Sequence, residues 1–599
     1  MLFAEDELQP KVYLVVALLA FITVGFHIYL IFTGLIPNLI TRPLHLALVL
    51  PWIFLFTKNE SKATQYFGYT LLVLSLFSTF YIIFNHSNLE EQYGSLEGPI
   101  QYFIAAILLI SVLEMARRSV KLALPITALI ALLYGLFGHF VPGNFGHQEI
   151  PLESFLGTLV IAEGGIFGTL TGISVNVVAV FVILGAFIGV GEGGNAFMSM
   201  STKLAGRLRG GAAKVSVLAS AFFGSISGSA SANVASTGAF TIPTMKRLKY
   251  PSSLAGSVEA VASTGGQIMP PLMGAGAFIM AELLSVKYTA IMSAAIFPSL
   301  LFFLTVWIGV DIFAKKYNLM AMNKEDIPSK KIVIKLAPFF MIPFGALLIA
   351  LIVIGKTPQY SAALAIFASI FMLLVDKDWN FSLSKFFKLF TKGCIIASKQ
   401  IAVIASIIIC AGIIIGVLNL TGVGVKITSA ILFLSAGELW LALLLTAFAC
   451  LILGMEVPTT AAYIICVSVA GPILQEYGLS AIQTHLFIFW FALLSTITPP
   501  VCGTVFIAAG MADTHWLKVA WKAMRLGVGL YIIPVAFITN PYLILPDQNF
   551  LLALASFVKI SLGLALVSYS LVNESKSFML RVLIFLAGLA IALSPMAMN

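Results

Sequence analysis

Between Lys214 and Lys246 the chain carries an uncharged run of about 31 residues, rich in glycine, serine and alanine, with basic residues on both sides. Positively charged loops mark the cytoplasmic side of a membrane protein, so both ends of the run are expected there. Two full crossings need about 40 residues, because each helix needs about 20. The run therefore predicts a re-entrant hairpin over residues 215–245. Irregular backbone survives at membrane depth only inside protein or beside a solvated cavity, which favours a substrate or ion site.

The composition places this hairpin in a membrane protein. Of 599 residues, 60% are hydrophobic and 10% are charged, whereas soluble domains carry roughly 25% charged residues. Long apolar runs recur along the chain, so an all-α polytopic membrane protein is predicted. The net charge of +9 arises from lysines and arginines in short loops, so it indicates topology and not a nucleic-acid partner.

Two apolar spans are each interrupted by adjacent prolines, at Pro270-Pro271 and at Pro499-Pro500. Proline lacks a backbone donor and clashes with the preceding helical turn, so both spans are predicted to be broken helices. A second hairpin is predicted over residues 438–480, where Pro458 interrupts an apolar run. Each hairpin tip precedes its double proline by a similar distance, about 42 and 41 positions. The chain therefore contains two repeats, offset by about 229–230 residues.

The two repeats differ in their charge pattern. The second hairpin has Lys426 before it, and no lysine or arginine lies between Glu438 and Lys518. This hairpin is therefore predicted to enter from the outside, opposite to the first. Two related halves of opposite orientation, each with a hairpin and a broken span, are typical of an inverted-repeat secondary transporter.

Four segments are predicted along the chain. They are scaffold helices over 1–150, a first inverted repeat over 151–335, a second over 336–545, and two peripheral helices over 546–599. The basic loops at Lys62 and at Arg117-Arg118 are expected on the cytoplasmic side, which places the N-terminus in the cytoplasm.

An ion gradient is the expected energy source, because the chain has no phosphate-binding Gly-Lys-Ser/Thr loop and no long soluble domain. Hydroxyls and freed carbonyls at helix breaks are hard oxygen ligands, which favours Na⁺. A single intramembrane hydroxyl can equally bond back to its own helix, so the prediction depends on the clusters. The first predicted sodium site comprises Ser229, Ser231, Asn233, Thr264, Gly265 and Met269. The second comprises Met455, Thr459, Thr460, Thr496 and Thr498.

The predicted substrate is an anion, because half-helix N-termini at the breaks present unpaired N–H groups. No arginine lies in either break, so dipoles, amides and sodium are expected to recognise it. A carboxylate inside a membrane is energetically costly, so it indicates a function, and Glu456, within the second hairpin, is the strongest candidate for contact with the ion or the substrate. Alternatively, Glu456 pairs with a lysine or carries a structural proton. The predicted substrate residues are Ser231, Asn233, Thr237, Gln267, Glu456 and Thr460.

Three stretches of the chain resemble the tripartite ATP-independent periplasmic (TRAP) transporters, in particular the fused membrane subunit of the TAXI type. They are FFGSISGSASANVASTGAFTIPTMKR, SVEAVASTGGQIMPPLMGAGAFIMAE and STITPPVCGTVFIAAGMA. The resemblance extends over most of 160–545. Residues 1–150 match the smaller membrane component in position and hydropathy alone.

The resemblance implies a sodium-coupled elevator importer in the bacterial or archaeal inner membrane. A TAXI-type periplasmic substrate-binding protein would deliver a small organic anion, a carboxylate or dicarboxylate, to a monomeric, lipid-embedded permease that is not an enzyme. The two hairpins and broken helices would move as one domain, with the substrate between the two tips. The first sodium site would combine Ser229–Asn233 with Ser263–Pro270, and the second Met455–Thr460 with Thr496–Pro499.

Two other interpretations remain. One is a stand-alone sodium/dicarboxylate symporter without a binding protein, which the fused N-terminal spans disfavour. The other is a channel or redox subunit. A channel would be expected to show repeated symmetric filters, and a redox subunit paired histidines or cysteines within spans.

Overall fold

The computed structural model of the chain describes residues 10–56, 61–120, 122–456, 458–499, 502–573 and 576–596. Within these ranges the regular structure is helical, apart from one isolated bridge between Val375 and Phe381. Nine helices of the described chain are long and apolar enough to cross a membrane, or ten if one bent pair forms a span. The prediction of an all-α polytopic membrane protein is therefore confirmed.

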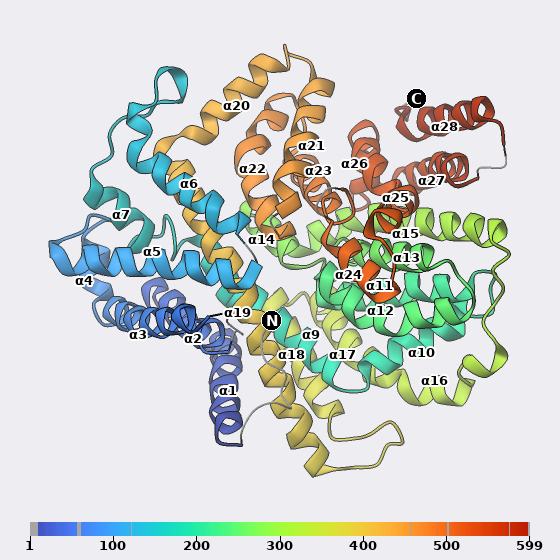
Figure 1. Cartoon of the computed structure of the whole chain (residues 1–599), viewed down its shortest axis with the longest axis horizontal. Coiled ribbons are helices and arrows are strands. Elements are labelled where there is room, and N and C mark those ends of the chain that lie inside the picture. The colour runs from blue at the N-terminus through green and yellow to red at the C-terminus, as the bar shows by residue number, and fades with distance from the viewer. Residues whose placement is uncertain are drawn as a thin grey trace.

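The N-terminal helices form a group on one side of the molecule and pack against the longest helix, α19 (Leu383–Thr421) (Figure 1). They are α1 (Pro10–Phe32), α2 (Asn38–Phe54), α3 (Lys62–Phe84), α4 (His86–Glu91), α5 (Gly98–Val120) and α6 (Ala123–Phe137). The Arg118 guanidinium donates to the Thr64 carbonyl oxygen at 2.8 Å. The two basic loops that we expected on one side of the membrane therefore lie together.

The segment predicted as the first repeat begins with α7 (Leu152–Val160), α8 (Thr169–Ile173) and a π-helix (Ser174–Val178). Its helices are α9 (Ala179–Val190), α10 (Gly193–Ala205), α11 (Gly211–Ser227), α12 (Ala230–Arg247), α13 (Ser252–Gly265), α14 (Ala275–Leu283) and α15 (Tyr288–Lys316). The predicted hairpin is formed by α11 and α12, which pack against each other across a two-residue turn. The predicted broken span is formed by α13 and α14.

The second repeat has the same order of elements. After α19 come α20 (Val423–Leu434), α21 (Leu439–Glu456), α22 (Thr459–Glu476), α23 (Ala481–Leu494), α24 (Gly503–Ala512), α25 (Trp516–Leu526) and α26 (Gly529–Thr539). The starts of α12 and α22 are 229 residues apart, those of α13 and α23 are 229 apart, and those of α14 and α24 are 228 apart. The internal repeat therefore has the offset expected from the proline spacing.

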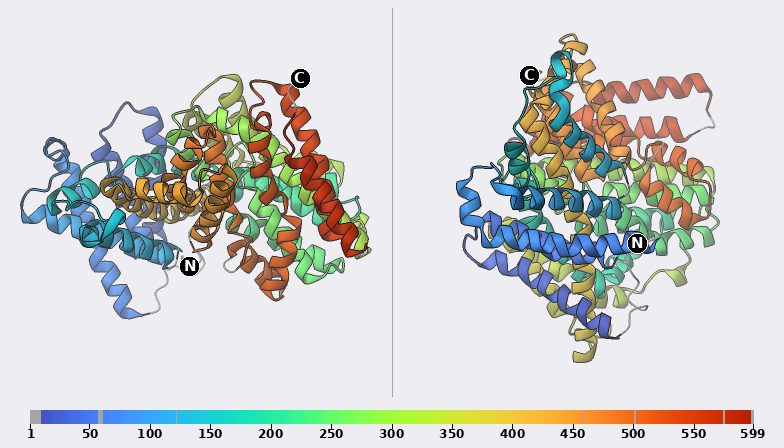
Figure 2. Two further views of the ribbon diagram at one scale, coloured as in Figure 1. Left: turned by 90° about the horizontal axis from the view of Figure 1, so that it is seen from above. Right: turned by 60° about the vertical axis from the view of Figure 1, so that its left-hand side comes forward.

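Between α15 and α19 lie three helices, namely α16 (Lys330–Leu336), α17 (Pro338–Leu348) and α18 (Pro358–Met372). The last two helices are α27 (Phe550–Val572) and α28 (Phe578–Leu593), which pack against each other, and α27 also contacts α15. Figures 1 and 2 show this pair at the edge of the molecule opposite the N-terminal helices, so it covers the outer side of the first repeat.

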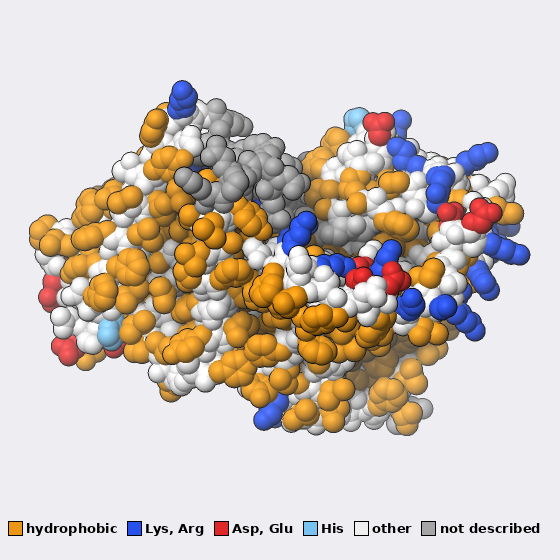
Figure 3. Space-filling view, turned by 90° about the horizontal axis from the view of Figure 1, so that it is seen from below, with side chains coloured by type: hydrophobic (Ala, Val, Ile, Leu, Met, Phe, Trp, Pro, Cys, Tyr) orange, Lys and Arg blue, Asp and Glu red, His pale blue; other side chains and the backbone are white. Residues whose placement is uncertain are grey.

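Hydrophobic side chains cover much of the surface in Figure 3, whereas Lys and Arg gather toward one end. Ion pairs connect elements at the open end of the first hairpin: Lys214 and Arg209 lie 2.8 and 2.9 Å from Asp311. Arg247, at the end of α12, lies 2.9 Å from Asp326. The open end of the α11–α12 hairpin, the end of α15 and the 324–326 turn therefore share one charged end, called the basic end below.

Candidate functional site

The tips of the two hairpins face a common cavity of about 180 Å³, called the tip cavity here. Ser227, Gly228 and Ser229 line it from the first hairpin, and Pro458, Thr459 and Thr460 line it from the second. The first break contributes Gln267, Leu272 and Gly274, and an apolar wall comes from α9, α14 and α19. The predicted meeting of both tips at one place is therefore present in the structure.

The first tip is shaped by its own residues. Gly228 has a φ of +58°, a left-handed conformation that suits glycine, and it ends α11. The Ser229 hydroxyl accepts a hydrogen bond from the Ala232 N–H at 3.3 Å and so caps α12. The buried Ser227 hydroxyl has no hydrogen-bond partner, although Ser227 lines the tip cavity. Because a buried hydroxyl without a partner is costly, Ser227 is a donor suited to a bound ligand.

Gln267 joins the two tips through its side-chain amide. Its Nε2 donates to the Gly228 carbonyl oxygen at 3.2 Å, and its Oε1 accepts from the Thr459 hydroxyl at 3.2 Å. Nδ2 of Asn233, by contrast, donates to the carbonyl oxygens of Ser220 and Ser263, at 2.9 and 3.4 Å. The Gln267 amide thus connects the two repeats at the cavity, while the Asn233 amide holds α12 against α11 and the broken span.

Three threonine hydroxyls meet where the two broken spans cross. Thr264 Oγ1 lies 3.2 Å from Thr496 Oγ1 and 3.4 Å from Thr504 Oγ1. Thr264 and Thr496 donate to the Ala260 and Leu493 carbonyl oxygens, both at 2.8 Å, and Thr504 donates to the Thr496 carbonyl oxygen at 2.7 Å. With each proton engaged by a carbonyl, the lone pairs of the three oxygens remain to face one another. Such a group can serve a hard cation.

Glu259 of α13 is fully buried, and five hydroxyls surround its carboxylate. Ser216 donates to Oε2 at 2.7 Å, and Ser263 and Ser220 donate to Oε1 at 3.1 and 3.3 Å. Thr237 and Thr241 complete the shell from α12. No salt bridge to Glu259 occurs in the described part of the chain, so hydroxyls alone provide its direct side-chain hydrogen bonds. The shell connects both hairpin helices to α13.

Glycines allow the first hairpin to lie directly on the first break. A Cβ at Gly224 would come within 2.2 Å of Gly266 Cα, and one at Gly228 would come within 2.4 Å of Gly274 Cα. The Leu272 N–H donates to the Ser225 carbonyl oxygen at 3.3 Å across the same contact. The hairpin and the irregular segment 266–274 therefore pack backbone against backbone.

The structure divides the predicted site residues into groups. Ser229, Gln267, Thr459 and Thr460 line the tip cavity, whereas Asn233 and Thr237 lie buried in the packing between α12 and α13. Ser231 is exposed on α12, outside the lining of that cavity.

The remaining predicted residues lie at the breaks. Thr264 and Thr496, assigned to different sodium sites, come together, and Thr498 instead meets Tyr531 Oη at 2.7 Å. Gly265 packs against Phe302, and Met269 is half-buried in the first break. Among the predicted breaking residues, Pro270, Pro271, Pro458 and Pro499 all lie between helices, while Pro500 and the side chains of Met455 and Glu456 are outside the described residues.

The sequence analysis missed the α9 and α19 wall of the tip cavity, the hydroxyl shell of Glu259, and the residues Ser227 and Thr504. A signal for the shell exists in the spacing, because its members form three pairs four residues apart. These pairs are Ser216 with Ser220, Thr237 with Thr241, and Glu259 with Ser263. Such pairs lie on one helical face. The α9 and α19 wall has no comparable polar pattern.

Comparisons with known proteins find a matching family model and several related proteins. A family model described as the DctM component of tripartite ATP-independent periplasmic transporters matches residues 107–589, from α5 into α28. The C4-dicarboxylate TRAP transporter large permease DctM of Pseudomonas aeruginosa is 27% identical over 378 residues, covering 61% of this chain and 84% of that protein. The 2,3-diketo-L-gulonate TRAP transporter large permease YiaN of Escherichia coli is 23% identical over 372 residues, covering 61% and 84%. The isethionate TRAP transporter permease DctMQ of Oleidesulfovibrio alaskensis is 23% identical over 399 residues, covering 63% and 60%.

Proposed function

The chain belongs to the DctM family of tripartite ATP-independent periplasmic transporters, and from this premise we propose that it imports a small organic anion in symport with Na⁺. A periplasmic substrate-binding protein delivers the anion. The chain is a multi-pass permease of the bacterial inner membrane. The curated relatives are named for carriage of a C4-dicarboxylate, 2,3-diketo-L-gulonate and isethionate, which supports an organic anion as the cargo.

The observation that carries this proposal is the tip cavity. Both hairpin tips line this cavity. The Gln267 amide donates a hydrogen bond to the first tip, at Gly228, and accepts one from the second tip, at Thr459. The start of α22 at Thr459 lines the same cavity, and the N-terminus of a helix favours negative charge. In this proposal the anion binds between the tips, with the Ser227 and Thr460 hydroxyls as donors.

The coupling ion follows from the oxygens at the two breaks. The lone pairs of Thr264, Thr496 and Thr504 face one another, and an all-oxygen group of this kind suits Na⁺ better than a soft metal ion. We place one sodium position at this crossing, shared by both repeats. A second position near the Ser229 tip is part of the same proposal.

An elevator movement is consistent with the packing. The Glu259 shell, the glycine contacts and the Thr264–Thr496 contact join the first hairpin and both broken spans. The opposite wall of the tip cavity belongs to α9 and α19. In the proposed cycle the re-entrant hairpins and broken spans move as one domain against that wall and the N-terminal helices.

The finer assignments follow the resemblance. We propose that residues 1–150 act as a fused small component, that the system is of the TAXI type, and that the permease is monomeric with a cytoplasmic N-terminus. The packing of α1, α2, α5 and α6 on α19 supports a scaffold role for the N-terminal helices.

Uptake by purified permease in proteoliposomes tests the proposal. The external medium would contain the cognate soluble binding protein, loaded in turn with radiolabelled C4-dicarboxylate, isethionate and diketogulonate. Accumulation of at least one anion should require an inward Na⁺ gradient. Equal uptake with K⁺ alone would exclude sodium coupling. Uptake without the binding protein would favour the stand-alone symporter instead.

A further inference from the structure

A cavity of about 320 Å³, called the lysine cavity here, lies between α16 and the turn 375–381 that follows α18. Lys331 and Lys335 line it from α16, and Lys377 lines it from the turn. Asp378 is the one acid among its described lining residues, and it lies 3.4 Å from Lys335. Three positive charges therefore share this cavity with one negative charge.

The fold brings these lysines together from two segments of the chain. Trp379 Nε1 donates to the Lys335 carbonyl oxygen at 3.2 Å, and the Trp379 ring packs against Phe339 with the ring centroids 5.7 Å apart. Within the turn, Asp376 Oδ1 accepts from two backbone N–H groups, both at 2.9 Å. The turn is therefore held in shape and fastened to α16, so Lys377 and the lysines of α16 line one cavity.

The lysine cavity lies where two apolar helices end. The helices α17 and α18 pack against each other, and the segment Lys324–Leu336, which contains α16, bends by 51° from the apolar segment Pro338–Val353. The Pro328 carbonyl oxygen, two residues after the 324–326 turn of the basic end, accepts from Lys203 at 3.0 Å. Tryptophans gather at membrane boundaries, and lysine-rich loops mark the cytoplasmic one. The cavity is therefore at the predicted cytoplasmic surface of the bilayer.

The lysine cavity combines free charge with apolar surface. Lys331 and Lys377 are exposed, and neither forms an ion pair with a described residue. The Ser329 hydroxyl accepts from the Ile332 N–H at 3.3 Å, so its own proton remains available to a ligand. The exposed Ile332 and the buried Leu336 line the same cavity. Positive charge, a hydroxyl donor and aliphatic side chains therefore meet at one place.

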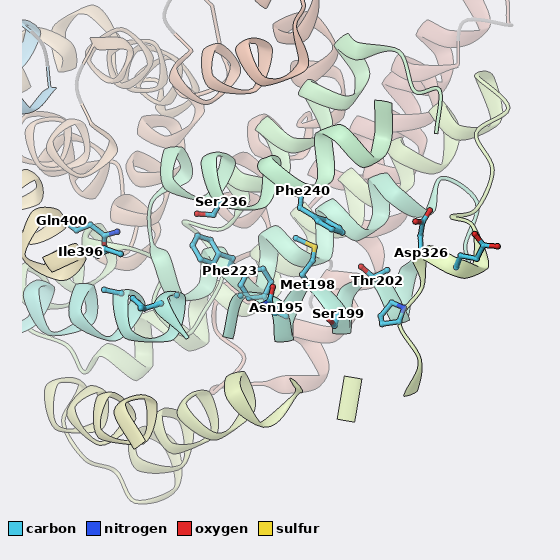
Figure 4. A pocket seen from close by; sticks show the side chains of 18 residues that line it. Asn195, Met198, Ser199, Thr202, Phe223, Ser236, Phe240, Asp326, Ile396 and Gln400 are labelled. Carbon is cyan, nitrogen blue, oxygen red and sulfur yellow. The ribbon is translucent and has the colours of Figure 1, made fainter. Parts of the chain in front are cut away.

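Lysines at a membrane boundary commonly mark topology alone. That is the simplest interpretation of Lys388 and Lys392 on α19, which are exposed and do not line the lysine cavity. Figure 4 shows another cavity near the basic end, of about 600 Å³, with Asp326 at one end. Its charged lining residues, within the described chain, are Glu325 and Asp326, so it does not suit an anion as the lysine cavity does.

We propose that Lys331, Lys335 and Lys377 bind the phosphodiester headgroup of an anionic phospholipid in the cytoplasmic leaflet. Basic pockets between transmembrane helices on this side of the membrane recognise such headgroups. Ile332 and Leu336 contact the beginning of the acyl chains, which a soluble phosphate lacks. The bound lipid joins α16 to the turn after α18. This inference does not depend on the proposed function.

Lipid binding to the purified full-length protein in detergent tests this site. Native mass spectrometry measures the affinity for phosphatidylglycerol, with phosphatidylcholine of the same acyl chains as the zwitterionic comparison. Phosphatidylglycerol should bind more tightly, and Lys331→Gln combined with Lys377→Gln should weaken its binding at least about tenfold, because the attraction to the headgroup is lost. Lys331→Arg combined with Lys377→Arg should retain it. Lys388→Gln combined with Lys392→Gln is the matched control: it removes the same charge from α19 and should bind the lipid like the wild type.

Equal weakening in the two glutamine pairs would overturn the proposal in favour of diffuse surface attraction, and so would equal binding of the two lipids by the wild type. Soluble glycerophosphoglycerol carries the headgroup without acyl chains, and it should bind at least about tenfold more weakly because the apolar wall stays uncovered. Equal affinity for it would contradict a lipid site. Melting temperatures without lipid check that each variant folds. Phosphatidylglycerol should raise the melting temperature of the wild type more than that of the Lys331 and Lys377 glutamine pair, and an equal rise would also contradict the site.

Discussion

Thr264 Oγ1 lies 3.2 Å from Thr496 Oγ1, although 232 residues separate the two threonines along the chain. Thr264 lies in the last turn of α13, just before the break of the first repeat. Thr496 lies just after the end of α23, in the break of the second repeat. The contact brings the two broken spans together at their polar interruptions. A single cation at this point would bind both halves of the transporter at once.

Replacing Thr264 with valine should weaken sodium binding. The change preserves shape but removes one oxygen, and losing one such contact costs about 1 kcal/mol, or about fivefold in affinity. The Na⁺ concentration for half-maximal uptake should rise by at least that factor. Thr305→Val is the matched control, because Thr305 is buried and makes a similar bond, to the Leu301 carbonyl oxygen at 2.7 Å, away from the breaks. Equal sodium dependence in both variants would remove Thr264 from the site.

Gln267→Ala should impair transport more than folding. The substitution removes both hydrogen bonds that connect the tips, to Gly228 and from Thr459, and it enlarges the tip cavity. We expect at least about tenfold lower kcat/KM, which corresponds to about 1.4 kcal/mol. Thermal unfolding in detergent serves as the folding check. Gln475→Ala, at an exposed position near the end of α22, is the control and should leave uptake unchanged. A normal uptake rate in Gln267→Ala would exclude a role of Gln267 at the tips.

Gly266→Ala should destabilise the packing of the first hairpin on the first break. The added Cβ would lie 2.5 Å from Gly224 Cα and 2.7 Å from Asn233 Nδ2, so backbone must move. Overpacking of this kind costs about 1–3 kcal/mol, and the melting temperature should fall. Gly503→Ala introduces the same methyl group where no atom lies within 4 Å. The two melting temperatures should therefore diverge, and equal values would argue against close packing at Gly266.

Glu259→Leu should lower stability strongly. The substitution leaves five buried hydroxyls without their common acceptor, at a cost of about 3 kcal/mol or more. Glu259→Gln keeps one acceptor oxygen and should be milder. Glu282→Gln, at an exposed position on α14, is the control. If the melting temperature of Glu259→Leu equals that of the wild type, the hydroxyl shell does not stabilise the packing of the hairpin against α13.

The order of elements was accessible from the sequence because it depends on local chemistry. Adjacent prolines cannot continue a helix, so the breaks at Pro270 and Pro499 and the repeat offset followed from spacing alone. The Gly/Ser-rich middle of the run likewise predicted a tip at Ser229–Asn233, and the structure places the turn at Gly228 and Ser229, at the start of that range. These features need only the neighbours in the chain.

The composition of the site was less accessible, since it depends on which helical faces meet. Thr264 and Thr496 were assigned to separate sites, and nothing local to either residue indicates their contact. Thr237 was expected at the substrate, yet its hydroxyl donates to Glu259 inside the packing. Val403 lines the tip cavity from α19, a helix whose sequence is that of a plain apolar span.

The most direct test of the transport site is substrate protection of single cysteines at the hairpin tips. Ser229→Cys and Thr460→Cys place one thiol on each tip within the tip cavity, and Ser199→Cys, on α10, places one in a different cavity as a control. A small water-soluble thiol reagent should modify all three, and the transported anion with Na⁺ should slow the reaction at both tips but not at Ser199→Cys. Unslowed modification at both tips, in protein that still accumulates the anion, would contradict binding between the tips.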